Sequence, residues 1–343
     1  MAERPFRPPF PWARVGVAVG LMGVAGSFFY GCLIHMPGRS AEPPLPALSA
    51  PESEARDRLR RDVEELAGGI GERHMGRPEA LERAAAFLEE QLRAAGYSPA
   101  RQTYSVDGQP CSNIEVAVPG KDGAMLVVGA HYDSARGSPG ANDNGSGVAA
   151  LLELARRLRG ATPDHEIRMV LFVNEEPPYF HTSKMGSRVW AEEAHRRGAK
   201  VIGMLSLETI GFYSDAPESQ KYPFPMSAFY PDRGQFLGFI GNVESGDFVR
   251  DAVGTFREVA TLPSEGAALP EHTTGVDWSD HASFWRFGWP AVMVTDTAPF
   301  RYPHYHTRHD RPDQVDAGAL ARAVVGLEHV VRSLAGPRKE GNR

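Results

Sequence analysis

The sequence has 343 residues, of which 42% are hydrophobic and 23% are charged, and these values are typical of globular proteins. Its formal net charge of −6 argues against a nucleic-acid-binding surface. The two cysteines, Cys32 and Cys111, form no CxxC pair. This excludes a cysteine-ligated zinc site and predicts one thiol, with no internal disulfide, in the folded domain.

The N-terminal region contains a candidate membrane anchor. Residues 15–34 are uncharged and mostly apolar, and a run of about 20 such residues is long enough to cross a bilayer. Three arginines lie within residues 1–14, which predicts that this end stays in the cytoplasm and that the rest of the chain is periplasmic or extracellular. A cleaved signal peptide and lipidation at Cys32 are the alternatives. All three interpretations export the domain that follows.

A linker, a globular domain and a short tail follow the anchor. Residues 35–52 are rich in Pro, Ala and Ser, which predicts an extended linker between membrane and domain. The domain covers residues 53–336 and the tail covers residues 337–343. Apolar side chains recur at three- and four-residue spacing near the start of the domain, which predicts helices over residues 54–68 and 78–95.

Strands then alternate with helices. Two segments of alternating polarity predict a hairpin or edge strands, and four continuous apolar runs predict strands buried on both faces. The order of elements predicts an α/β fold: a three-layer sandwich with a mixed, mostly parallel central sheet flanked by helices. The predicted strands are residues 101–106, 113–120, 124–130, 167–173, 201–207 and 290–296, and the predicted helices between and after them are residues 147–158, 188–198 and 317–334.

One long segment does not follow this alternation. Residues 212–277 contain many Pro, Gly and aromatic residues. A loop-rich insertion of this length inside a compact domain usually serves function. We therefore expect a cap-like insertion that forms part of a substrate pocket.

Candidate metal ligands stand where the predicted strands end, and the carboxyl ends of strands are where open α/β sheets bind ligands. His131 follows the first apolar run, and a neutral imidazole there is a good zinc ligand. Asp133, two residues later, is placed to accept the second ring N–H of His131 and fix its tautomer. Asp143 lies in a loop of small residues before a helix, and its two oxygens can bridge two cations about 3.5–4 Å apart.

Acidic residues also end the next two apolar runs. Two adjacent buried carboxylates, Glu175 and Glu176, make sense if one binds a cation and the other holds a proton. We assign Glu176 as a metal ligand and Glu175 as the general base, which takes a proton from water and returns it to the leaving amine. Glu208 ends the third run, and His306 lies in a loop with two other histidines, among which spacing alone does not choose.

Each of these residues alone is explained as well by a helix cap, a turn or a solvated loop. Together they supply only imidazole and carboxylate donors, which suit two Zn²⁺ or similar divalent cations. A bridging carboxylate gives three protein ligands to each cation and leaves room for a shared water or substrate. The predicted sets are His131, Asp143 and Glu208 for one cation, and Asp143, Glu176 and His306 for the other.

At these residues the chain resembles metallopeptidase family twenty-eight, which includes aminopeptidases, glutamate carboxypeptidases and glutaminyl cyclases. The resemblance covers about residues 59–334 and rests on GAHYDS, GANDNGSGVAALLELAR, NEE, LETIG, SDHASFW and YHT. It implies a zinc exopeptidase domain with two metal ions that cleaves N-terminal residues from peptides. It also selects His306, supports Glu175 as base, and places Asp280 and His281 near the active centre, as candidates for orienting substrate.

The chain departs from the family pattern in places that bear on the substrate. Glu208 stands where many members have Asp, and PPYFHTSKMGS follows the glutamate pair in place of a simpler glycine-rich turn. A glutaminyl cyclase, with one zinc, is therefore an alternative. A carboxypeptidase is another, because Arg301 and Arg308 flank His306. A non-catalytic receptor-like relative predicts missing ligands, and none is missing. Oligomeric state is left open.

Overall fold

The computed structural model describes residues 30–337. The predicted cytoplasmic segment, residues 1–14, and most of the predicted anchor lie outside the described residues. Among the described residues, no helix combines the length and apolar character needed to cross a bilayer. The end of the apolar run, Tyr30–Ile34, is a short π-helix (η1). Ile34 is buried against the domain.

The described residues form one eight-stranded sheet in the order β1-β2-β4-β3-β5-β8-β6-β7. Strands β4, β3, β5 and β8 are parallel neighbours, as are β6 and β7. The β1–β2, β2–β4 and β6–β8 pairs are antiparallel. This confirms the predicted mixed, mostly parallel sheet. The strands are β1 (Ala100–Val106), β2 (Gln109–Val118), β3 (Ala124–His131), β4 (Glu166–Phe172), β5 (Lys200–Glu208), β6 (Leu237–Asn242), β7 (Ser264–Leu269) and β8 (Ala291–Thr295).

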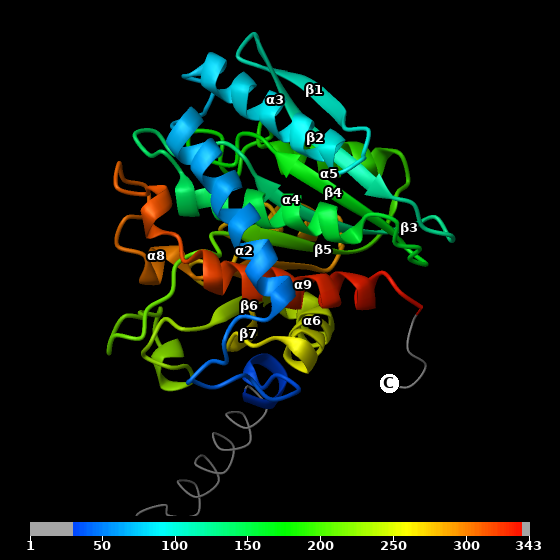
Figure 1. Ribbon diagram of the computed structural model, residues 1–343. Coiled ribbons are helices and arrows are strands. Elements are labelled where there is room, and N and C mark those ends of the chain that lie inside the picture. Colours follow the sequence, from blue (N-terminus) through cyan, green and yellow to red (C-terminus); the bar gives the residue numbers. More distant parts are fainter. Residues whose placement is uncertain (1–29, 338–343) are drawn as a thin grey trace, which may run out of the picture.

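Helices cover both faces of the sheet and make the predicted three layers. One layer holds α2, α3, α4, α6 and α9, with α2, α4 and α9 in front of the sheet in Figure 1. The opposite layer holds α5 and α7, which contact each other. The helices are α2 (Ala50–Val63), α3 (Pro78–Ala94), α4 (Gly147–Leu158), α5 (Gly186–Arg196), α6 (Gly246–Val259), α7 (Ala282–Trp285), α8 (Ala298–Arg301) and α9 (Ala317–Leu334).

Short helical segments fill the connections. The π-helices are η2 (Glu64–Ile70) and η3 (Ala141–Ser146), and the 3-10 helices are η4 (Met226–Ala228), η5 (Val243–Ser245) and η6 (Pro312–Gln314).

Side chains of the central strands alternate between the two helical layers. In β3, Leu126 and Val128 belong to the core under α4, whereas Val127 belongs to the core under α5. Strands buried on both faces need apolar residues at every position, which explains the continuous runs in the sequence. Because β3, β4, β5 and β8 are parallel, their carboxyl ends meet at one edge of the sheet, where ligands bind in folds of this type.

The segment expected to be a loop-rich cap is partly regular. Residues 237–269 form β6, α6 and β7, which extend the central sheet, so the irregular parts are residues 212–236 and the stretch after β7. Both strands contain glycine, which weakens the sequence signal for a strand. In the fold, Gly266 gives room to Met36, whose Cγ would lie 2.8 Å from an added Cβ.

The predicted linker, residues 35–52, lies against the domain. The backbone N–H of Ser264 on the edge strand β7 donates a hydrogen bond to Ser40 Oγ at 2.9 Å. Helix α2 begins at Ala50, earlier than predicted, because Ser49 caps it. The Ser49 hydroxyl accepts from the Glu52 N–H, and the Glu52 carboxylate accepts from the Ser49 N–H.

Candidate metal centre

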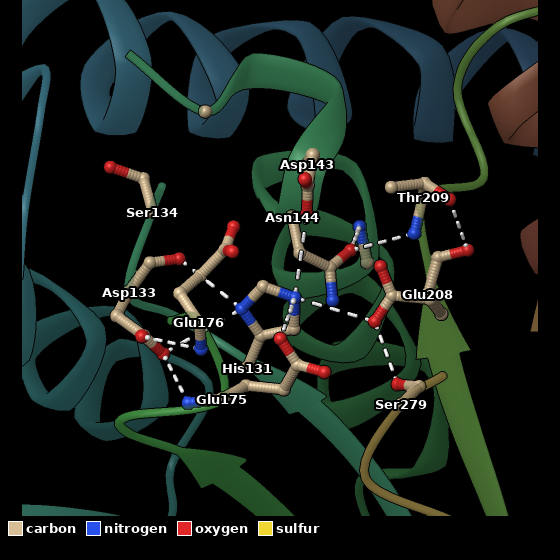
Figure 2. A network of polar contacts seen from close by, with 12 residues as sticks. His131, Asp133, Ser134, Asp143, Asn144, Glu175, Glu176, Glu208, Thr209 and Ser279 are labelled. Atoms are coloured by element: carbon tan, nitrogen blue, oxygen red, sulfur yellow. Dashed lines mark hydrogen bonds and ion pairs between the residues drawn. The ribbon is translucent and has the colours of Figure 1, made fainter. Parts of the chain in front are cut away.

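The residues predicted to bind metal meet at the carboxyl edge of the sheet. His131 and Glu208 are the last residues of β3 and β5, and Asp143 lies in η3. The glutamate pair follows β4, and His306 lies in the loop after α8. The predicted ligands other than His306 are buried. Figure 2 shows the His131 ring at the centre of the cluster, with carboxylates from four separate segments around it.

Asp143 stands between the two histidines. Its Oδ1 lies 3.4 Å from His131 Nε2, and its Oδ2 lies 2.9 Å from His306 Nε2. On one side Glu208 Oε2 is 3.3 Å from His131 Nε2, and on the other Glu176 Oε2 is 3.2 Å from His306 Nε2. Within each of the two predicted sets, the donor atoms lie within 4.8 Å of one another. The geometry therefore brings together the ligand sets that the sequence predicts.

Four of the donor atoms are buried without a hydrogen bond, which fits a site that holds divalent cations. His131 Nε2, Asp143 Oδ2, Glu176 Oε1 and His306 Nε2 have no hydrogen-bond partner among the described residues. Asp143 Oδ2 and His306 Nε2 lie close together but make no hydrogen bond to each other. Unpaired polar atoms are rare in protein interiors. Two Zn²⁺ or similar cations would satisfy these atoms, since all of them are imidazole or carboxylate donors.

The charges of the cluster also favour cations. Burial raises the pKa of Glu176 to about 7 and raises the pKa of Glu175 well above its usual range. Burial opposes a charged His306, but Asp143 and Glu176 outweigh it and raise the pKa of His306 to about 10. The carboxylates of Glu208 and Glu175 likewise raise the pKa of the buried His131. Protons on the histidines thus supply positive charge that cations would replace.

Left-handed backbone places three residues of the site. Asn174, just before the glutamate pair, has φ +62°, Thr209, just after Glu208, has φ +43°, and His306 itself has φ +56°. Each such conformation in a residue other than glycine costs about 1 kcal/mol or more, and such strain is concentrated at functional sites. Gly140, which lies shortly before Asp143, is also left-handed (φ +66°). An added Cβ at Gly140 would lie 2.6 Å from the Asp143 carbonyl oxygen.

Asp133 acts mainly on the glutamate pair. Its carboxylate accepts hydrogen bonds from the backbone N–H groups of Glu175 and Glu176, both at 3.2 Å. The predicted contact with His131 Nδ1 is made by the Asp133 carbonyl oxygen at 3.2 Å, while the nearest carboxylate oxygen is 3.6 Å away. The backbone carbonyl of Asp133 therefore orients the His131 ring, and the Asp133 carboxylate orients the turn that carries Glu175 (Figure 2).

Two orienting residues, Ser279 and Asn144, lie in the sequence motifs but had no predicted role. Ser279 Oγ donates a 2.7 Å hydrogen bond to Glu208 Oε2, the oxygen that faces His131. The Asn144 side chain ties the loop of η3 to the end of β5, because its amide donates to the Leu207 carbonyl at 2.8 Å and its oxygen accepts from the Thr209 N–H at 3.0 Å. Ser279 therefore orients a predicted ligand directly, and Asn144 fixes the loop that carries Asp143.

The two residues predicted to orient substrate lie in the protein interior. Asp280 and His281 are both fully buried. Burial raises the pKa of Asp280 to about 7 and lowers the pKa of His281 to about 4, so His281 stays neutral near pH 7. His281 Nε2 lies 2.7 Å from the Val276 carbonyl oxygen, and its ring packs edge-on against Trp285. Neither residue lines the pocket beside the metal ligands.

An apolar pocket opens beside Glu208 and Tyr305. Its walls come from β6, β7 and β8, from residues 212–236 and from the stretch after β7. Its larger apolar lining residues include Tyr222, Met226, Tyr230, Phe236, Ile240, Leu269, Trp278, Met293 and Phe300. The candidate metal centre therefore adjoins a pocket that can take an apolar side chain.

Comparison with known proteins places this site in a family of enzymes. The family model described as Peptidase family M28 matches residues 113–331. The uncharacterized protein YfbL of Escherichia coli (strain K12) is 35% identical over 304 residues, which are 86% of this chain and 92% of the relative. Leucine aminopeptidase 1 of Arthroderma otae is 27% identical over 270 residues, which are 71% of this chain and 66% of the relative.

Solved structures share the fold. A zinc aminopeptidase from Bacillus subtilis superposes with a TM-score of 0.67 at 16% identity, over 84% of this chain and 96% of the neighbour. A glutaminyl cyclase from Fimbriiglobus ruber superposes with a TM-score of 0.60 at 20% identity, over 86% of this chain and 97% of the neighbour. At these identities the likeness concerns the fold alone, and the site must decide the chemistry.

Proposed function

The chain belongs to peptidase family M28, and on this premise we propose that it is a metal-dependent aminopeptidase that removes N-terminal residues from peptides. One observation carries the proposal. Two ligand sets share Asp143, and Glu175, which belongs to neither set, lies beside them with Oε2 3.8 Å from His131 Nε2. The set of His131, Asp143 and Glu208 would hold one cation, and the set of Asp143, Glu176 and His306 the other.

The metals and Glu175 have different roles in the proposed reaction. When bound, two divalent cations polarise the scissile carbonyl and increase the acidity of a water molecule. Glu175 then accepts a proton from the attacking water as the new C–O bond forms, and donates that proton to the leaving amine as the C–N bond breaks. The burial that raises the pKa of Glu175 suits a group that takes up and returns a proton. The Asp133 carboxylate orients Glu175 by accepting a hydrogen bond from the Glu175 backbone N–H.

The nearby arginines offer little to a peptide carboxylate. When bound, one of the two cations could take the free amine of a peptide as a neutral ligand, while the carboxylates around the cations would be offset by their charge. Arg301, which a carboxypeptidase would need as a carboxylate partner, is buried and donates to Gln220 Oε1 at 2.7 Å and to the Phe236 carbonyl at 2.8 Å. Arg308 is exposed, and its Nε donates to His309 Nε2 at 3.3 Å. Neither arginine lines the pocket beside the metal ligands, which favours an aminopeptidase.

A glutaminyl cyclase is the second candidate, since the fold is shared with such enzymes. Cyclisation needs one metal, whereas a second ligand set is useful when water must be activated for hydrolysis. Both sets are complete here, which supports hydrolysis.

Peptide digestion separates these functions. The full chain, supplied with zinc, would be incubated with a peptide mixture in free and N-acetylated forms, and products would be identified by mass spectrometry. Stepwise loss of N-terminal residues from free peptides alone supports the proposal. Loss from the C-terminus, or ammonia loss from N-terminal glutamine without cleavage, moves the assignment to a carboxypeptidase or a cyclase. The Glu175→Gln variant controls for a contaminating peptidase.

We also propose that the enzyme is anchored in a membrane with its catalytic domain outside the cytoplasm. The apolar run of residues 15–34 and the arginines before it support this orientation. In intact cells from which any outer membrane has been removed, a protease added outside should digest the domain. Protection until the cells are lysed would contradict the proposed orientation.

A further inference from the structure

A row of residues crosses the sheet from the metal centre to its far edge. Glu208 on β5 pairs with Thr295 on β8, Thr295 pairs with Gly238 on β6, and Gly238 pairs with Glu265 on β7. Neighbouring strands lie about 4.8 Å apart, so the row spans roughly 14 Å from the first backbone to the last. The four residues of the row all line the pocket beside the metal centre.

The row forms the floor of a trough. In the middle, Gly238 has no side chain, and an added Cβ would lie 3.3 Å from the Thr295 carbonyl oxygen. One step along the strands, Met293, Ile240 and Ala267 form a parallel apolar row. Aromatic residues of the irregular segments complete the lining. The trough is therefore apolar along its length and has a carboxylate at each end.

The Glu265 carboxylate is free to accept hydrogen bonds from a ligand. Its side chain is 31% exposed, and it accepts no hydrogen bond from the described residues. Its one ion pair, with Arg257, is long at 3.8 Å. The Arg257 guanidinium is committed elsewhere, since it donates to Ser264 Oγ at 3.0 Å, to the Ser264 carbonyl at 2.7 Å and to the Met36 carbonyl at 3.2 Å. Burial raises the pKa of Glu265, as expected for a carboxylate with a weak counter-charge.

Among the described residues, Arg257 is the one cation paired with Glu265, and it lies outside the pocket lining. Lys221 is the sole cationic side chain among the described lining residues, and it is exposed and makes no ion pair with Glu265. An acidic group at the end of an apolar channel selects ligands that carry a positive charge beyond an apolar stem, because a buried charge needs a partner.

We propose that Glu265 selects peptides whose N-terminal residue is arginine or lysine, with the side chain lying along the trough and its charged end paired with Glu265. The inference rests on the proposed aminopeptidase function. An extended arginine side chain reaches about 7 Å from its Cα. The rest of the roughly 14 Å row is taken up by the substrate backbone beside Glu208 and by the ion pair at Glu265.

Pairs of substrates that have similar side-chain shapes but different charges test whether Glu265 recognises a positive charge. The zinc-loaded full chain would be assayed on short peptides that begin with arginine or citrulline, lysine or norleucine, and leucine. We expect kcat/KM for arginine to exceed that for citrulline by about 10–100-fold, as loss of a charged hydrogen-bonded pair implies. Glu265→Gln should reduce this ratio to less than about threefold. Glu271→Gln, at an exposed glutamate beyond β7, should leave the ratio at its wild-type value.

The inference fails if leucine peptides are cleaved faster than arginine and lysine peptides, or if Glu265→Gln leaves the arginine-to-citrulline ratio as it was. Calorimetric binding of free L-arginine and L-citrulline separates this failure from a failure of the proposed function. If no peptide is cleaved but arginine binds more tightly than citrulline only when Glu265 is present, the pocket assignment stands and the catalytic proposal falls. Equal binding of the two amino acids overturns the inference.

Discussion

The carboxylate of Asp310 accepts a hydrogen bond from the backbone N–H of Asp143 at 3.1 Å. Its other oxygen accepts from the Asn142 N–H at 2.8 Å and from the Tyr302 hydroxyl at 2.9 Å. The shared ligand is therefore positioned through its main chain by an acidic residue about 170 positions away in the sequence. Orientation of this kind is what allows two oxygens of one carboxylate to face two histidines.

Replacing Asp310 should loosen the metal site. In Asp310→Asn one acceptor oxygen becomes an NH₂ group, which faces N–H or O–H donors and displaces the loop. We expect zinc affinity to fall about 10–100-fold, the usual effect of losing a partner that orients a ligand. Competition with a chromogenic chelator measures this. Asp313→Asn, at an exposed aspartate in the same region, should bind zinc like the wild type, and an unchanged affinity in Asp310→Asn would refute the role.

Glu175→Gln should separate metal binding from turnover. The amide keeps the size of the side chain but cannot accept and return a proton, so kcat should fall by about 10²–10⁴-fold. Because Glu175 belongs to neither ligand set, metal content determined by elemental analysis should stay at the wild-type value. Wild-type turnover would rule out Glu175 as the base, and loss of metal would instead make it a ligand.

Zinc binding should release protons. In the metal-free chain the pKa of His306 is raised to about 10 and that of Glu176 to about 7, so at pH 8 His306 still carries a proton that zinc must displace. Apparent affinity should therefore rise as pH increases, by about tenfold per pH unit for each proton released, and more steeply below pH 7, where Glu176 is also protonated. Calorimetric titrations in two buffers with different ionisation enthalpies count these protons. Affinity that is independent of pH between 6 and 9 would contradict the assignment.

The buried strands and their ends could be predicted from the sequence because each carries a local signal. Strands β3, β4, β5 and β8 are continuous apolar runs, and His131 and Glu208 end two of them, whereas Asp143 and His306 lie further along the loops that follow β3 and β8. By contrast β6 and β7 contain glycine and alternate weakly, so the pairing of β6 with β8 and of β7 with β6 depends on contacts distant in sequence. For the same reason the trough that ends at Glu265 could not be predicted, since it exists only once four strands are in register.

The roles of some motif residues also escaped prediction. Asp310 and Ser279 lie in the motifs, but they matter because of the N–H or carboxylate they contact, and sequence spacing does not encode those contacts. Asp133 was predicted to orient His131 with its carboxylate, but that carboxylate instead accepts the two N–H groups of the glutamate turn. A motif thus identifies a functional residue more reliably than it identifies the atom that makes the functional contact.

Arg73 also has a structural role that the sequence did not predict. It is fully buried, and its guanidinium donates to the carbonyl oxygens of Tyr132 at 2.6 Å, Pro139 at 2.6 Å and Gly140 at 2.8 Å. These carbonyls belong to the loop that joins β3 to η3, between His131 and Asp143. Burial lowers the pKa of Arg73 to about 10, so the group remains charged at neutral pH.

Arg73→Lys should destabilise the chain even though the charge is kept. Lysine has one nitrogen and cannot reach three carbonyls that the planar guanidinium contacts together, so buried acceptors lose their partners. We expect the free energy of unfolding to fall by about 2–4 kcal/mol, measured by urea unfolding at fixed zinc concentration and again with a chelator present. Arg136→Lys, at an exposed arginine in the same loop, should stay within about 0.5 kcal/mol of wild type. An unfolding midpoint for Arg73→Lys equal to that of Arg136→Lys would show that the carbonyl contacts do not hold the loop. A loss seen only with zinc present would place the effect on metal binding rather than on the fold.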